Sequence, residues 1–372
     1  MSDVVILLGA GASVESGAPL MADFLQVADD LMRGAKAGND RQHFVKVFEA
    51  IAALKPIPAQ ISLDTYNLES VFSAFEMGAL VGRLGDLSLA DIEAARTGMV
   101  RVITRTLQES MLFPLTGSAP ALALNPTQHY EQFANALNAI VQCAGPLHNR
   151  PALGYPTVIS LNYDLGLDLA LSKLGINYTY GFEDKLPDNI VKVLKLHGSL
   201  NWGQCAACGV ALYWKIDDFL NSRFASLVVS KDGKTATLPI GDHINGLRCQ
   251  PCGQPAKDGP LLVPPTWNKT EQKPIRNVWR HAAKELSEVR YLFFIGYSFP
   301  GTDLYLRHLA ALGLASSTRL RKVFVINPSP KACDVFLNEI AGPTLKHPQI
   351  FRNHRYDFSE GARQIPSLIA QS

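Results

Sequence analysis

Short, mostly apolar runs that lead directly into small or polar residues dominate the hydrophobic pattern of this chain. Four of them cover residues 4–8, 157–161, 291–295 and 322–326. Such runs, without regular alternation of apolar and polar residues, are typical of parallel strands buried on both faces. In open α/β sheets, ligands bind just beyond the carboxyl ends of the strands. The pattern therefore predicts a parallel sheet with helices on both faces and a binding site at one edge.

Two stretches lack this pattern and predict insertions. Between residues 24 and 150, strand-like runs are scarce and apolar residues recur at helical spacing, as in Leu68, Val71 and Phe75. Residues 201–260 contain paired cysteines and turn-rich segments. We expect residues 1–372 to form one Rossmann-like α/β domain that carries a helical insertion at 24–150 and a small cysteine-bearing insertion at 201–260.

The composition is that of a soluble globular protein, because 47% of the 372 residues are hydrophobic and 18% are charged. The net charge of +2 does not support broad electrostatic attraction to nucleic acid or anionic lipid, so no direct nucleic-acid binding is expected. No apolar stretch approaches the roughly 20 residues of a membrane span. The N-terminus has no basic region that would indicate a signal peptide. We therefore expect a cytoplasmic protein without membrane association.

Four of the six cysteines form two C-x-x-C pairs. Two such pairs supply four thiolates, the ligand set of a closed tetrahedral zinc site. In a reducing compartment this arrangement favours metal over disulfides. A closed site leaves no coordination position open, so the predicted Zn²⁺ is structural. The predicted ligands are Cys205, Cys208, Cys249 and Cys252.

A glycine-rich turn, Gly9-Ala10-Gly11-Ala12-Ser13, follows the first apolar run. Glycines let the backbone approach a phosphate at a helix N-terminus, where free amides and the helix dipole favour negative charge. The usual dinucleotide fingerprint carries a third glycine where this chain has Val14. On this motif alone, a phosphate site and a strand-to-helix turn without a ligand both remain open.

Three polar residues beyond predicted strands are candidates for chemistry. Asn162 and Asp164 follow the run 157–161, and His197 follows a further strand-like run at 191–196. We expect the three side chains at the same sheet edge. A neutral imidazole there could accept a proton from a hydroxyl group or water. The alternatives are a structural histidine, and helix-capping or turn-forming roles for Asn162 and Asp164.

The order of these motifs resembles the SIR2 (sirtuin) family. The matching elements are the glycine-rich turn with Gly17-x-Pro19, Asn162-Tyr163-Asp164, His197-Gly198, the paired C-x-x-C, Gly296-Tyr297-Ser298 and Asn327. The resemblance implies that NAD⁺ is the substrate, that Asn162 and Asp164 lie near the nicotinamide and its ribose, and that His197 acts as a base. It also implies NAD⁺-binding roles for Gly9, Ala10, Gly11, Ser13, Gly296, Ser298 and Asn327.

Two segments differ from the protein-deacylating members of this family. Leu20-Met21-Ala22 stands where those members have Asp-Phe-Arg, and residues 263–269 replace their Phe-Gly-Glu segment. The Pro-Pro-Thr-Trp-Asn-Lys segment at residues 264–269 and the Gly-Tyr-Ser-Phe-Pro-x-x-Asp segment at residues 296–303 instead resemble a bacterial SIR2-like branch. Members of that branch cleave NAD⁺ in defence against phage, often beside a partner ATPase or Argonaute protein. The resemblance implies such an activator protein and a homo-oligomer.

We therefore expect an NAD⁺ glycohydrolase, an antiviral defence effector that releases nicotinamide and ADP-ribose. In the first alternative, NAD⁺-dependent protein deacylation, an acyl-lysine oxygen attacks in place of water. The altered segment at residues 263–269, which corresponds to the Phe-Gly-Glu near the substrate groove of the deacylating members, favours water. The second alternative is a non-catalytic sensor that binds NAD⁺ or ADP-ribose without turnover.

Overall fold

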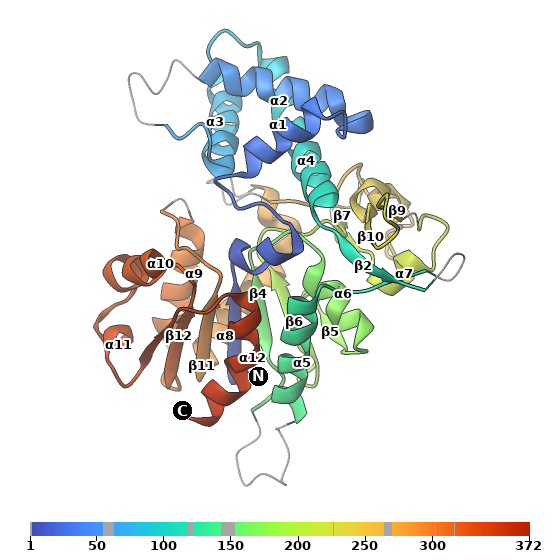
Figure 1. Ribbon diagram of the computed structural model, residues 1–372. Coiled ribbons are helices and arrows are strands. Elements are labelled where there is room, and N and C mark those ends of the chain that lie inside the picture. Colours follow the sequence, from blue (N-terminus) through green and yellow to red (C-terminus); the bar gives the residue numbers. More distant parts are fainter. Residues whose placement is uncertain are drawn as a thin grey trace. The chain divides into compact units, whose positions relative to one another are not determined.

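The computed structural model describes residues 2–54, 63–117, 122–142, 153–225, 227–263, 270–301, 303–315 and 317–372. The chain forms two compact units (Figure 1). The first comprises Met1–Ser16, Phe113–Gly198 and Pro274–Ser372, and the second comprises Gly17–Leu112 and Ser199–Lys273. Most of the 263–269 segment, with its resemblance to the defence branch, lies outside the described residues.

A seven-stranded parallel sheet forms the centre of the first unit, in the order β13-β12-β11-β1-β4-β6-β5. The four apolar runs in the sequence correspond to β1, β4, β11 and β12, so the predicted α/β fold is confirmed. The strands are β1 (Val4–Leu8), β4 (Thr157–Ser160), β5 (Tyr178–Thr179), β6 (Val191–Lys195), β11 (Tyr291–Ile295), β12 (Lys322–Ile326) and β13 (Phe351–His354).

Two groups of helices cover the sheet. Helices α5 (Gln128–Gln142), α6 (Gly166–Lys173) and α12 (Phe358–Ala370) form one packed group, and α8 (Arg276–Glu288) and α9 (Leu304–Ala315) form the other. In Figure 1 the first group lies in front of the sheet and the second behind it. The connection from β1 to β4 and the connection from β11 to β12 run in opposite directions across the sheet. Because such crossovers are right-handed, the helices in these two connections, α5 and α9, lie on opposite faces of the sheet.

The remaining elements of the first unit are short. Strands β2 (Phe113–Thr116) and β3 (Ala123–Leu124) form an antiparallel pair. Helices α10 (Pro330–Val335) and α11 (Pro343–Lys346) lie between β12 and β13 in the chain. The segment β2–α5 falls within the predicted 24–150 insertion, but it belongs to the unit that contains the sheet. The predicted division into one domain with two insertions stays a prediction.

The second unit contains a helical part in which α4 is the common partner of three other helices. The apolar stripe of Leu68, Val71 and Phe75 is buried on α3, as its spacing predicts. None of the helices in the described part of the chain combines the length and apolar character that a membrane span requires. The helices are α1 (Phe24–Arg33), α2 (Arg41–Leu54), α3 (Leu68–Val81) and α4 (Leu89–Ser110).

The cysteine-bearing part of the second unit is made of short elements. An antiparallel pair, β7 and β8, precedes the short helix α7, and a second antiparallel pair, β9 and β10, follows it. Their bounds are β7 (Trp202–Gln204), β8 (Ala211–Tyr213), α7 (Ile216–Leu220), β9 (Val228–Val229) and β10 (Thr235–Thr237).

Arg105 of α4 joins segments of the second unit that are far apart in the sequence. Its guanidinium lies 2.9 Å from Asp40 Oδ2 and 3.1 Å from Asp242 Oδ2, and all three side chains are largely buried. Burial alone would lower the pKa of Arg105, but the carboxylates of Asp242 and Asp40 raise it above its usual value. One cation therefore balances two carboxylates that would otherwise repel each other.

The Arg105→Met variant is expected to lower the free energy of unfolding by about 1–3 kcal/mol, because two largely buried carboxylates lose a charged hydrogen-bond donor. Urea denaturation followed by circular dichroism measures this change. Arg33→Met is the matched control, since Arg33 pairs with Asp29 at an exposed position and its loss should change stability by less than about 0.5 kcal/mol. Equal denaturation midpoints for the two variants would contradict the assignment.

Candidate active site

The glycine-rich turn after β1 packs directly against the loop after β11. Gly9 N donates to Ile295 O at 3.0 Å, and Gly11 N donates to Gly296 O at 2.9 Å. A Cβ on Gly9 would lie 2.6 Å from Gly296 O, so no larger residue fits there without displacing backbone. The winding of the sheet reverses at β1, where doubly wound folds bind their ligands. Close contact between the two loops is one physical reason for both glycine motifs.

The turn leads into two 3-10 turns, Ala10–Ala12 and Val14–Ser16, rather than into the helix N-terminus expected from the sequence. Ser13 N donates to Ala10 O and Ser16 N donates to Ser13 O, so hydrogen bonds between residues three apart close both turns. The first α-helix begins only at Phe24, in the second unit. The turn therefore lacks the long helix dipole on which the expected phosphate site was argued.

Ser13 is the centre of a buried polar network. Its hydroxyl donates to Asp164 Oδ2 at 2.5 Å, and its oxygen lies 2.9 Å from both Asn162 Nδ2 and Tyr130 Oη. A serine hydroxyl has one proton and two lone pairs, so donation to Asp164 leaves the oxygen to accept from the other two groups. Ser13 is 2% exposed. Its side chain thus uses its full hydrogen-bonding capacity within the protein.

The side-chain amide of Asn162 is oriented by the glycine turn. Its Nδ2 donates to Ser13 Oγ and, at 3.0 Å, to Gly9 O. A carbonyl oxygen can only accept, so Gly9 O identifies the side of the amide that carries the nitrogen. Asn162 Oδ1 therefore faces away from Gly9 O. This oxygen is the acceptor that the Asn162 side chain can offer to a hydroxyl group or water.

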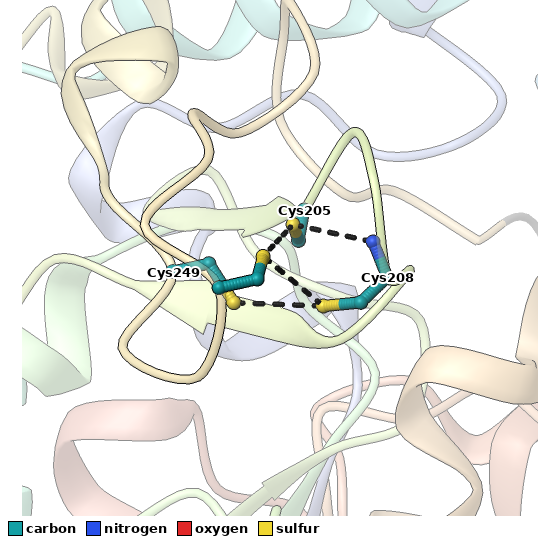
Figure 2. Close-up of side chains that lie close together, drawn as sticks. Cys205, Cys208 and Cys249 are labelled. Atoms are coloured by element: carbon teal, nitrogen blue, oxygen red, sulfur yellow. Dashed lines mark hydrogen bonds between the residues drawn. The ribbon is translucent and has the colours of Figure 1, made fainter.

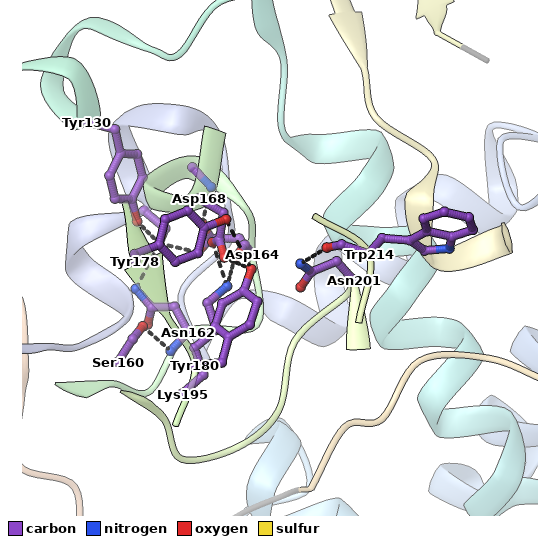
Figure 3. Close-up of polar contacts among 12 residues, drawn as sticks. Tyr130, Ser160, Asn162, Asp164, Asp168, Tyr178, Tyr180, Lys195, Asn201 and Trp214 are labelled. Atoms are coloured by element: carbon purple, nitrogen blue, oxygen red, sulfur yellow. Dashed lines mark hydrogen bonds and ion pairs between the residues drawn. The ribbon is translucent and has the colours of Figure 1, made fainter. Parts of the chain in front are cut away.

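Asp164 ties this network to the start of α6 (Figure 3). Its Oδ1 accepts from Gly166 N at 2.9 Å, while its Oδ2 accepts from Ser13. Burial, reinforced by the negative charge of Asp164, raises the pKa of Tyr130 well above its usual value, so its phenol stays protonated. The contacts of Asp164 are those of a turn-forming residue, which was one of the two alternatives that the sequence left open.

His197 and Asn162 follow adjacent strands at the same edge of the sheet. Ser160 at the end of β4 pairs with Lys195 at the end of β6, and each candidate residue comes two positions later. His197 is 5% exposed, and its ring centroid lies 6.4 Å from those of Tyr163 and Trp279. The parallel register therefore brings the two strand ends together, as the sequence pattern predicts.

The other predicted NAD⁺-binding residues lie on the loops after β11 and β12. Ser298 is exposed. Asn327 Nδ2 donates to Tyr297 O at 3.1 Å, and Asn327 Oδ1 accepts from Ser329 N at 2.9 Å. Asn327 thus ties the two loops to each other. Binding roles for Ser298 and Asn327 stay a prediction.

Sequence reasoning missed Tyr130 and Lys195, which both contact residues of this site. The Tyr130 phenol reaches Ser13 from α5, and no local motif around Tyr130 indicates that contact. Lys195 offers a signal, because it is a charged residue at the end of the buried strand VKVLK. A buried ammonium requires a partner, so its position could have marked it for attention.

A second buried cluster holds the end of the glycine-rich segment. His129 Nε2 lies 2.8 Å from Ser16 Oγ and 3.2 Å from Thr127 Oγ1. The carboxylate of Glu15 lies 3.7 Å from His129 Nδ1. Burial lowers the pKa of His129 below its usual value, although the charge of Glu15 opposes that shift. The neutral imidazole is therefore the form that the fold favours.

The two cysteine pairs converge in the second unit (Figure 2). Their four Sγ atoms all lie within 4.8 Å of one another. Three of the Sγ–Sγ separations are 3.4 Å for Cys205–Cys252, 3.5 Å for Cys208–Cys249 and 3.7 Å for Cys208–Cys252. Zinc–sulfur bonds of about 2.3 Å in a tetrahedron place sulfurs ~3.8 Å apart, so the cluster fits zinc.

The thiols differ in how readily they ionise. The backbone amide of Cys208 helps to lower the pKa of Cys205 to about 6, whereas burial raises the pKa of Cys249 to about 12. A bound Zn²⁺ would stabilise all four thiolates. The predicted four-cysteine ligand set, which could hold a structural zinc, is thus assembled in space.

Neither a protein-family description nor any curated protein matches the chain. Solved structures of Sir2 homologues align with the whole length of this chain. These proteins belong to the family that the order of the motifs resembles. A Sir2 homolog–NAD complex is 15% identical, with a TM-score of 0.37, and the alignment covers 100% of this chain and 91% of that one. Sir2 bound to acetylated peptide is 14% identical, with a TM-score of 0.38 and coverage of 100% and 95%. A structure of a Sir2 enzyme described in terms of mechanism and regulation is 15% identical, with a TM-score of 0.41 and coverage of 100% and 94%.

The purified protein is expected to carry about one zinc ion per chain, because four thiolates form one closed site. Cys205→Ser should reduce the zinc content to near zero and lower the melting temperature. Elemental analysis by mass spectrometry and thermal denaturation measure the two effects. Cys333→Ser is the matched control, since Cys333 is a buried thiol outside the cluster. Zinc retained in full by Cys205→Ser would contradict the site.

The lowered pKa of His129 predicts that stability falls on acidification. Between the unfolded pKa near 6.5 and the lower folded pKa, the unfolded chain binds a proton that the folded chain does not. The contribution of His129 to the free energy of unfolding is complete above about pH 6.5. Within that window it falls by about 1.4 kcal/mol for each unit by which the pH is lowered. His129→Gln should flatten this slope in urea denaturation series from pH 7.5 to 5. Part of the slope that remains should come from His354, because burial also lowers the pKa of that residue. An unchanged slope would exclude His129 as its source.

Proposed function

We propose that the chain is a SIR2-type NAD⁺ glycohydrolase that releases nicotinamide and ADP-ribose. The proposal rests on the order of the family motifs in the sequence and on one structural observation. Asn162 and His197 lie two positions beyond the paired residues Ser160 and Lys195, on adjacent strands. This edge adjoins β1, where the winding of the sheet reverses and where open α/β sheets bind their ligands.

In the proposed reaction, the bond between the nicotinamide nitrogen and the ribose C1′ breaks, and nicotinamide leaves with the bonding electron pair. Positive charge develops on the ribose carbon, and a water oxygen then bonds to it. The released proton passes to a base. Because nicotinamide is a good leaving group, positioning and exclusion of bulk water can supply much of the acceleration.

The proposed roles follow from the contacts of each side chain. Asn162 Oδ1 faces away from Gly9 O, so it can accept a hydrogen bond from the attacking water or from a ribose hydroxyl. His197 is the proposed base. Asp164 supports the turn that carries Asn162, because its carboxylate engages both Ser13 and Gly166 N. Its proposed role is thus positioning or ribose contact.

The NAD⁺ contacts proposed for the glycine-rich turn differ from one residue to the next. Ala10 and Gly11 are partly exposed, which leaves their backbone accessible to a phosphate. The Ser13 hydroxyl is already engaged by Asp164, Asn162 and Tyr130. We therefore propose that Ser13 contributes by holding the turn in place while neighbouring backbone meets NAD⁺.

We further propose that the protein acts in the cytoplasm as a defence effector against phage, as a homo-oligomer with an ATPase or Argonaute-type activator. This part rests on the resemblance to the bacterial SIR2-like branch. The segment at residues 263–269, in place of the Phe-Gly-Glu near the substrate groove of deacylases, favours water over an acyl-lysine as the nucleophile.

The protein, alone or with its activator, is expected to convert NAD⁺ to nicotinamide and ADP-ribose without an acylated peptide. Asn162→Ala and His197→Ala should each lower turnover by about 10²- to 10⁴-fold, the range for loss of a positioned acid–base group. Chromatographic product analysis measures turnover, and circular dichroism verifies folding. Asn353→Ala on β13 and His308→Ala on α9 are matched controls at exposed positions.

Full turnover by both site variants would exclude the assignment of these two residues. Nicotinamide release only in the presence of an acylated peptide would identify a deacylase. Binding of NAD⁺ or ADP-ribose without product, with the activator present, would identify a sensor.

A further inference from the structure

A lysine, Lys195, is buried at the end of β6, two residues before His197 (Figure 3). The side chain of Lys195 is 2% exposed, and that of Asp168 on α6 is fully buried. Lys195 Nζ donates to Asp168 Oδ2 at 2.7 Å and to the backbone oxygen of Asp164 at 2.6 Å. One ammonium group therefore joins β6, α6 and the turn after β4.

The carboxylate partner is itself held in place. Tyr180 Oη donates to Asp168 Oδ1 at 2.5 Å, so Lys195 and Tyr180 engage both carboxylate oxygens of Asp168. Burial raises the pKa of Tyr180 well above its usual value, and the charge of Asp168 adds to the shift, so the phenol remains a donor. The geometry of the ion pair is thereby constrained from both sides.

A buried ion pair is a weak source of stability, because removing two charges from water costs about as much as their attraction returns. Stability alone therefore does not explain this pair. The location of the ion pair does offer an explanation. Lys195 lies two residues before His197, and the Asp164 carbonyl that Lys195 contacts lies two residues after Asn162. The ammonium thus links the main chains that carry the two proposed catalytic side chains.

We propose that Lys195, held by Asp168, is a positioning residue that sets the placement of Asn162 relative to His197. This inference rests on the proposed function. Neither Lys195 nor Asp168 acts on the substrate. The pair acts through the Asp164 carbonyl, which Lys195 holds at a fixed distance from the end of β6.

The same strand supplies a matched control. Lys192 near the start of β6 forms a buried ion pair with Glu285 on α8, at 2.9 Å. Glu285 also accepts hydrogen bonds from Ser2 N and Thr157 Oγ1, at the amino-terminal ends of β1 and β4. Both pairs therefore belong to the same sheet core, but only the Lys195 pair lies at the edge with Asn162 and His197.

The test compares two double variants of the full chain, each of which removes both charges of one pair. Lys195→Met/Asp168→Asn should lower kcat for NAD⁺ on the order of 100-fold with little change in KM, because misplacement of catalytic groups affects the transition state. Lys192→Met/Glu285→Gln should leave kcat near that of the wild type. Thermal denaturation should show similar losses of stability in the two variants.

The single variant Asp168→Asn separates the ion pair from the contact it supports. It retains the Lys195 ammonium and its bond to the Asp164 carbonyl, so its loss of kcat should be smaller than that of the first double variant. Equal kcat losses in the two double variants, or wild-type kcat in Lys195→Met/Asp168→Asn, would overturn the inference.

Hydrogen exchange keeps this test separate from the proposed function. If the wild type does not turn over NAD⁺ even with its activator, the proposed function fails and amide exchange of residues 161–167 decides the positioning claim. The inference requires faster exchange there in Lys195→Met/Asp168→Asn than in Lys192→Met/Glu285→Gln. Equal exchange in both variants would overturn it.

Discussion

The hydrogen bond from Ser13 to Asp164 is the interaction on which the arrangement of the candidate site depends. It commits the single proton of the hydroxyl, which leaves the Ser13 oxygen to accept from Asn162 and Tyr130. The turn after β1, the turn after β4 and helix α5 are thereby joined at one atom. Together with Gly9 O, this atom accepts from Asn162 Nδ2 and so fixes the orientation of the Asn162 amide.

Two further constraints act on the same sheet edge. The backbone contact of Gly9 and Gly11 with Gly296 leaves no room for side chains between the turn after β1 and the loop after β11. The buried ammonium of Lys195 holds the turn after β4 to the end of β6. Hydrogen bonds, close backbone packing and a buried charge thus each define one border of the site. A polar network of this kind is stable in a buried environment only when its members are satisfied.

The sequence could predict the parts of this structure that depend on local pattern. Strands β1, β4, β11 and β12 were predictable because strands buried on both faces are apolar along their length. The cysteine cluster was predictable because two C-x-x-C pairs have few chemical uses in a reducing compartment. The expected helix after the glycine-rich turn was wrong, since two 3-10 turns occupy residues 10–16. Whether a strand-to-helix turn continues as a helix depends on contacts with distant segments, here α5 and the turn after β4.

The contacts of Tyr130 and Lys195 could not be predicted, because their partners are distant in the sequence and are brought close only by the fold. The central claim is that Asn162 Oδ1 and the His197 ring face the same ribose carbon. A crystal structure with bound ADP-ribose tests this claim most directly. The account predicts the anomeric hydroxyl of the ribose within hydrogen-bonding distance of Asn162 Oδ1 and beside the imidazole of His197. ADP-ribose bound elsewhere, or with its ribose remote from both side chains, would contradict the account.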